Sequence, residues 1–99
     1  MIKSKDLKQG KTIWIVRPDT DALVQRSECV FVAIPYLVMS KNYIRSPSYT
    51  PDRMMNINTA STLIDAQDPL RYGIFLSRRS ASSFQKKVTN HWMNQVYAQ

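Results

Sequence analysis

The chain has little glycine, cysteine and histidine, and each shortage excludes a class of functional site. Its only glycines, Gly10 and Gly73, are too few for a dinucleotide-binding fingerprint or a glycine-rich phosphate loop. Its single cysteine and single histidine, Cys29 and His91, cannot complete a four-ligand zinc site within one chain. We therefore expect neither a metal nor a cofactor.

Groups that commonly perform catalysis are also scarce. His91 is the only imidazole, and its position beside Trp92 favours a packing role. Cys29 lies in an apolar run, where a buried structural thiol is expected. The close carboxylate pairs lie in turn-like sequence, where Asp commonly hydrogen-bonds the local backbone: Asp19 with Asp21, and Asp65 with Asp68. The sequence thus predicts no catalytic residues and a protein that is not an enzyme.

Long apolar runs are absent as well. The longest mainly apolar run, from Cys29 to Met39, contains Pro35 and is shorter than the roughly 20 residues that span a bilayer. The opening segment MIKSKDLKQG lacks the apolar stretch of a secretory signal, and one cysteine forms no internal disulfide. We expect a cytoplasmic protein without a membrane segment.

What the chain has in excess is positive charge. Lysine and arginine number 14 against 7 aspartate and glutamate, which gives a formal net charge of +7. The excess lies mainly at the two ends, in the lysine-rich residues 1–11 and in the C-terminal part of the chain. Such a balance favours polyanionic partners.

The middle of the chain carries the signals of short strands. Residues 12–16 are consecutively apolar, so this strand should be covered on both faces, and Arg17 to Asp19 should end it. Residues 28–34 predict a second strand, with Pro35 limiting its extension, and residues 36–39 could continue it after a bend. Further short strands are expected at 43–45, 54–57 and 71–76. Residues 61–67 predict one or two helical turns capped by Ser61 or Thr62.

The clearest element is a helix from about Arg78 to Tyr97. Its apolar residues recur every three or four positions and define one buried face: Ala81, Phe84, Val88, Trp92 and Val96. Ser77 is the expected N-cap, and Ser80 would serve nearly as well. The whole pattern predicts one α+β domain over residues 1–99, with a lysine-rich segment at 1–11, a mainly β region at 12–76 and the helix at 77–97. We expect a mainly antiparallel sheet of four to five strands packed by one long C-terminal helix.

The first candidate binding site is the start of this helix. Arg78 and Arg79 lie in its first turn, where the helix dipole disfavours cations, so a phosphate or a partner's carboxylate there would explain them. Lys86 and Lys87 follow on the same helix and extend the candidate site. The alternative is that both arginines bend toward Asp65, Asp68 or solvent.

The second candidate is the segment from Lys41 to Arg53. It interleaves aromatic rings with cations, the combination that single-stranded nucleic acid requires, in Tyr43, Arg45, Tyr49 and Arg53. The same composition suits a protein-binding loop. Tyr43 could instead be a cross-strand core residue.

The segment FLSRRSASSF, residues 75–84, resembles the strand-to-helix junction of small uncharacterised proteins of bacteriophages and enterobacterial prophages. The resemblance implies a small α+β accessory protein with no assigned activity. It supplies no catalytic residues.

Two functions follow as hypotheses. The first is a non-enzymatic binding protein that docks on another protein, such as a host or phage factor. The alternative is a nucleic-acid-binding protein whose basic N-terminal segment and C-terminal helix contact phosphates. One continuous basic face that includes both arginines would reverse this order. Self-association is a further possibility, because Trp92 and Tyr97 could complete the core or form a symmetric contact.

Overall fold

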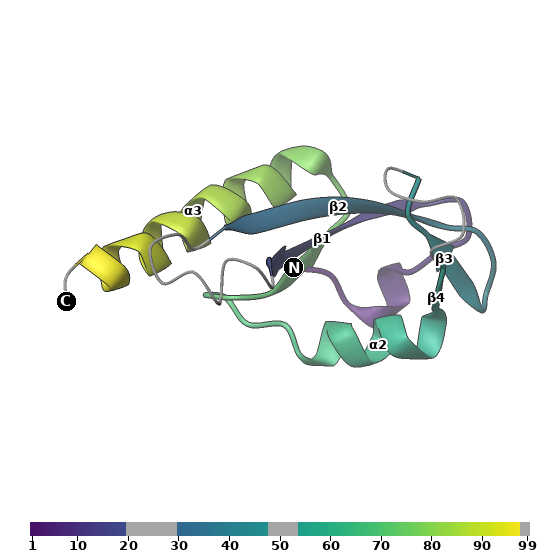
Figure 1. Cartoon of the computed structure of the whole chain (residues 1–99). Helices are drawn as coiled ribbons and strands as arrows, with labels where there is room; N and C mark the ends of the chain where they lie inside the picture. Colours follow the sequence, from purple (N-terminus) through teal and green to yellow (C-terminus); the bar gives the residue numbers. More distant parts are fainter. Residues whose placement is uncertain (20–29, 48–53, 98–99) are drawn as a thin grey trace.

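The computed structural model describes residues 1–19, 30–47 and 54–97. A five-stranded antiparallel sheet lies between one long helix on one side and a shorter helix with a 3-10 turn on the other (Figure 1). The elements are η1 (Ser4–Asp6), β1 (Thr12–Pro18), β2 (Phe31–Val38), β3 (Tyr43–Arg45), β4 (Met54–Asn56), α2 (Ile57–Asp65), β5 (Gly73–Phe75) and α3 (Arg78–Tyr97). This architecture confirms the predicted α+β class.

The strand order β4-β3-β2-β1-β5 makes β1 an inner strand. The first four strands follow one another as an antiparallel meander, and β5 pairs with the free side of β1. Because β4 and β5 lie at opposite edges, the connection through α2 crosses one face of the sheet. That crossing supplies the cover of the face opposite to α3 (Figure 1).

Both faces of β1 are covered, as its consecutive apolar residues predicted. Ile13 and Ile15 belong to the core between the sheet and α2, whereas Val16 belongs to the core under α3. All three are at most 2% exposed. Burying such a side chain contributes about 1.5–3 kcal/mol, so a central strand that is apolar on both sides joins two cores.

The first strand ends where the sequence predicted, and β2 takes the continuation past Pro35 that the sequence left open. Pro35 does not end β2, which runs to Val38. The N–H that proline lacks would be on the β3 side of β2, and β3 pairs with β2 only at Leu37 and Val38, so no strand needs that N–H. β1 ends at Pro18, which lies opposite Phe31, within the predicted terminating segment from Arg17 to Asp19. The expected start of the second strand at Glu28 and Cys29 lies outside the described residues.

The shorter helix also differs from expectation. α2 begins at Ile57, and its cap is Asn56, whose Oδ1 accepts the Asn58 backbone N–H at 2.8 Å. Ser61 and Thr62, the predicted caps, lie inside the helix, and the Thr62 hydroxyl donates to the Asn58 carbonyl. The apolar residues before Asn56 form β4, so strand and helix follow without a loop. The last strand, β5, is also shorter than the predicted 71–76 and covers Gly73–Phe75.

The terminal helix follows the sequence prediction closely. The Ser77 hydroxyl accepts the backbone N–H of Ser80 at 3.2 Å, which confirms Ser77 as the cap. Ala81 and Val88 are fully buried, and the Phe84 ring packs on the Phe75 ring at a centroid distance of 5.0 Å. The side chain of Val96 lies outside the described residues.

The outer edge of β5 is closed by the Gln67 side chain and the backbone N–H of Ile2 rather than by a strand. The Gln67 amide oxygen accepts the Ile74 N–H at 2.8 Å, and its nitrogen donates to the carbonyls of Ile2 at 2.8 Å and Ile64 at 3.1 Å. Ile2 in turn donates its N–H to the Ile74 carbonyl. Gln67 therefore ties the N-terminal segment, α2 and β5 together.

We expect Gln67→Ala to lower the free energy of unfolding by roughly 1–3 kcal/mol, because it leaves partly buried backbone groups unpaired. Gln67→Glu should also destabilise, since a carboxylate accepts from Ile74 but cannot donate to the carbonyls of Ile2 and Ile64. Urea unfolding measures both effects. The control is Gln95→Ala on the exposed surface of α3, and equal values for Gln67→Ala and Gln95→Ala would contradict this role.

Candidate binding surface

Four cations lie exposed on α3: Arg78, Arg79, Lys86 and Lys87. Arg79 and Lys86 are seven residues apart, close to two turns at about 3.6 residues per turn, so they share one side of the helix. That side is opposite to the buried stripe with Ala81 and Val88. Arg78 and Lys87 flank it. We call these four residues the cationic helix face.

The cationic helix face has no acidic neighbour on its own helix, because α3 contains neither Asp nor Glu. Among the described residues, none of the four cations forms an ion pair. Neither arginine is therefore paired with Asp65 or Asp68, and both side chains are exposed to solvent, the other part of the predicted alternative. Asp68 instead accepts the backbone N–H of Leu70 at 2.9 Å.

Arg78 connects this helix to the sheet. Its guanidinium carbon lies 6.0 Å from the centroid of the Trp14 ring, at the outer limit of a cation–π contact. Trp14 is half-buried and points from β1 toward α3. The start of the helix is therefore beside the aromatic ring of an inner strand.

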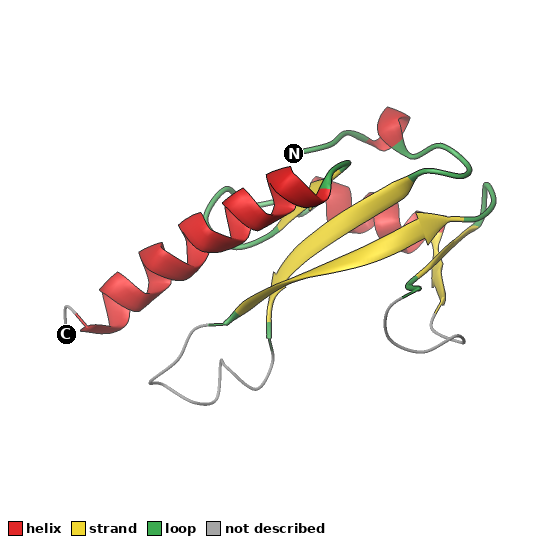
Figure 2. Cartoon of the chain, turned by 90° about the horizontal axis from the view of Figure 1, so that it is seen from above, coloured by secondary structure: helices red, strands yellow, loops and turns green. Residues whose placement is uncertain are grey.

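The two faces of the sheet are covered unequally. On the α2 side, Tyr36, Val38 and Ile44 are all buried. On the α3 side, burial falls away from the helix, from Phe31 at 4% exposure to Met54 at 51%. Figure 2 shows why: α3 lies over one part of the sheet, and no helix of the described residues covers β3 or β4 on this side.

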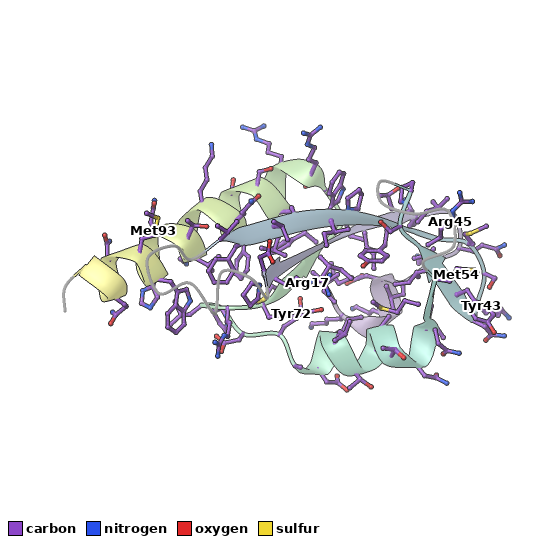
Figure 3. All side chains as sticks on the ribbon, viewed as in Figure 1. Arg17, Tyr43, Arg45, Met54, Tyr72 and Met93 are labelled. Atoms are coloured by element: carbon purple, nitrogen blue, oxygen red, sulfur yellow. The ribbon has the colours of Figure 1, made fainter. Side chains whose placement is uncertain are left out.

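We call the uncovered α3-side surface the open face. Its residues are Thr12, Pro35, Leu37, Tyr43, Arg45, Met54 and Asn56, with the half-buried Trp14 at its border with α3. The strand register places Leu37 opposite both Thr12 and Arg45, and Arg45 opposite Met54, so these four form one row across the sheet. Tyr43, Arg45 and Met54 lie at the β3–β4 end of the molecule (Figure 3).

The structure separates the residues of the second candidate segment. Tyr43 is 46% exposed and is not a core residue, because its neighbour Ile44, at 0%, fills the core instead. Arg45 is half-buried, and its Nε atom has no hydrogen-bond partner. Tyr49 and Arg53 lie outside the described residues. The open face thus unites Tyr43 and Arg45 with Trp14, whose position in an apolar run had given no signal beyond that of a core residue.

A hollow runs along the flank of α3 that Arg78 shares. Its described lining residues are Ser82, Gln85, Lys86, Thr89 and Asn90. The Gln85 amide donates to the Phe31 carbonyl, so this flank lies beside β2. The lining offers hydroxyl, amide and ammonium donors and no carboxylate.

The lysine-rich N-terminal segment lies on the other side of the sheet. Ile2 and Leu7 pack into the α2-side core, which fixes η1 beside α2 (Figure 1). Lys5 and Lys8 are exposed there. The two basic ends of the sequence therefore do not form one surface.

His91 takes part in a packing cluster at the far end of α3. It meets the Trp92 ring edge-on at a centroid distance of 5.5 Å, and the guanidinium of Arg71 lies 5.4 Å from the same ring. The Trp92 indole N–H donates to the Leu70 carbonyl. This cluster fastens α3 to the turn before β5. Among the described residues, no three His, Cys, Asp or Glu side chains are grouped closely enough to hold a metal ion.

Tyr72 lies under the sheet beside Arg17 (Figure 3). Burial raises the pKa of the Tyr72 hydroxyl from its ordinary value of 10.0 to about 12, while the Arg17 charge acts in the opposite direction and Tyr36 adds a small increase. The fold therefore favours the neutral phenol.

No protein-family model matches the chain, and no curated protein or solved structure is similar to it at a significant level. Within the described residues, none of the helices has the length and apolar character that a membrane span requires.

We expect the Tyr72 shift to make the protein less stable in strong alkali. Below pH 10 the phenol is protonated in both states, whereas between about pH 10 and 12 only the unfolded chain releases the proton, so the free energy of unfolding falls. Tyr72→Phe should remove this component. Urea unfolding of the parent protein and of Tyr72→Phe between about pH 10 and 12 measures the difference, because lysine titration is common to both proteins. Parallel dependence of the two free energies of unfolding on pH would contradict the raised pKa of Tyr72.

Proposed function

We propose that this is a small non-enzymatic cytoplasmic protein that binds nucleic acid through the cationic helix face. The observation that carries the proposal is the acid-free helix α3 with four exposed cations and no ion pair among the described residues. Cations that are not neutralised within the protein are available to phosphates, and their binding releases counterions from the nucleic acid. The junction at residues 75–84 is consistent with a phage or prophage accessory protein.

The arrangement of charge favours this function over protein docking. The cationic helix face gathers both arginines and two lysines on one helix, although the N-terminal lysines do not join it, and this gathering favours nucleic acid as the first hypothesis. The described carboxylates lie elsewhere, since Asp6 belongs to η1, Asp65 to α2 and Asp68 to the turn after α2, and Asp19 follows the far end of β1. The phosphate contacts are assigned to α3 alone, because the N-terminal lysines lie on the other side of the sheet.

We expect DNA binding to weaken steeply with salt, and the double variant Arg79→Ala with Lys86→Ala to reduce the slope of log K against log salt by about two. The loss should be similar for different DNA sequences, because phosphate contacts carry no sequence information. Fluorescence anisotropy at several salt concentrations measures both quantities.

The charge-matched control is Lys5→Ala with Lys8→Ala, which removes the same charge from the opposite side of the sheet. This pair should change the slope much less. Equal effects of the two pairs would mean that net charge alone attracts DNA, and absence of binding at low salt would end the proposal.

Protein docking remains a second candidate because the open face and its border expose apolar side chains. Met39, Tyr43 and Met54 are 42%, 46% and 51% exposed. A stoichiometric partner recovered from a bacterial lysate should then be lost with Met54→Asp and kept with Leu70→Asp, a change at an apolar residue of another surface that is 42% exposed. Loss with both variants, or with neither, would count against this candidate.

A further inference from the structure

We infer that the open face binds the bases of single-stranded nucleic acid while the cationic helix face holds its phosphates. This inference rests on the proposed function and specifies its substrate class. The juxtaposition that carries it is an aromatic sheet surface bordered by an acid-free cationic helix, with Arg78 and Trp14 in contact where the two meet.

The open face has the side-chain chemistry that bases and phosphates require. It presents two aromatic side chains, Trp14 and Tyr43, and one cation, Arg45, and none of the described carboxylates belongs to it. Aromatic rings stack on bases irrespective of sequence, and arginine pairs with phosphate or stacks on a base. Charge complementarity therefore favours a polyanion that carries planar rings over a neutral apolar partner.

Single-stranded and duplex nucleic acids differ in which of the two surfaces they can use. In a duplex the bases are stacked inside and only phosphates and groove edges are accessible, so a duplex could use the cationic helix face but not the rings of the open face. A single strand can use both, because its bases can turn away from its backbone. The presence of both surfaces on one side of the sheet matches the single strand.

The distance between the Trp14 and Tyr43 positions sets the length of the strand that could contact both. Trp14 lies opposite Pro35, and Tyr43 lies on the next strand, two residues before Arg45, which faces Leu37. With about 4.8 Å between strands and about 3.3 Å per residue, the two ring positions are about 16 Å apart. A stacked strand rises about 3.4 Å per nucleotide, so an oligonucleotide of several nucleotides reaches both positions and one nucleotide does not.

The experiment compares a labelled oligo(dT) strand of about 12 nucleotides with a hairpin duplex of similar length, since oligo(dT) forms no secondary structure of its own. Tyr43→Ala should weaken single-strand binding roughly ten-fold, the loss of one stacked base, and leave duplex binding unchanged. Tyr43→Phe keeps the ring and should restore single-strand affinity. Leu70→Ala, a change at an exposed apolar residue outside the open face, should retain it.

A second readout places the strand on the protein. The chain has two tryptophans, so the indole N–H signals of Trp14 and Trp92 can be followed separately by NMR. Oligo(dT) should shift the Trp14 signal and leave that of Trp92, which is bonded to the Leu70 carbonyl, in place. A change in the Trp92 indole signal without a change in the Trp14 signal would overturn the inference.

The outcomes separate the inference from the proposed function. Equal affinity for duplex and single strand, with no effect of Tyr43→Ala, overturns the inference and leaves phosphate binding by α3 standing. Loss of affinity with Leu70→Ala as large as with Tyr43→Ala would mean that the effect is not specific to the open face and would also overturn it. Failure of both nucleic acids to bind at low salt overturns both.

Discussion

The burial of β1 on both of its faces is the constraint on which the other elements depend. Ile13 and Ile15 require cover on one side and Val16 on the other, so the sheet needs a layer on each face. α2 meets the first need because it must cross the sheet to connect β4 with β5, and α3 meets the second with the stripe that contains Ala81 and Val88. With only one of the two helices, one apolar face of β1 would be exposed to water.

The two layers are not equivalent, and the difference creates the candidate site. The α2-side core extends over four strands and is sealed at the β5 edge by the hydrogen bonds of Gln67. α3 is held at one side of the sheet by Phe84 on Phe75 and by Gln85 on the Phe31 carbonyl. A single straight helix cannot cover a five-stranded sheet, so the outer strands keep one face without a helix. The binding surface is therefore a consequence of incomplete cover.

Local patterns predicted the elements that carry strong periodicity and left the outcome open, or failed, where pairing decided it. The α3 face and its Ser77 cap follow from side-chain spacing and hydroxyl chemistry, which are properties of a single helix. The sequence left open whether β2 continues past Pro35, because the effect of a missing N–H depends on whether a neighbouring strand needs it. Asn56 was missed as a helix cap because the apolar residues before it favoured a continuous strand.

The sequence by itself determined the composition of the site: an acid-free helix with paired cations, and a segment that alternates tyrosine with arginine. Only the tertiary structure decided which of these residues share a surface. Trp14 lies beside Arg78, and Tyr43 lies on the same side of the sheet as both, because strand register fixes which face each side chain occupies. The N-terminal lysines fall on the opposite side because Ile2 and Leu7 pack beneath the sheet. Long-range pairing and burial set these positions, and no local pattern contains them.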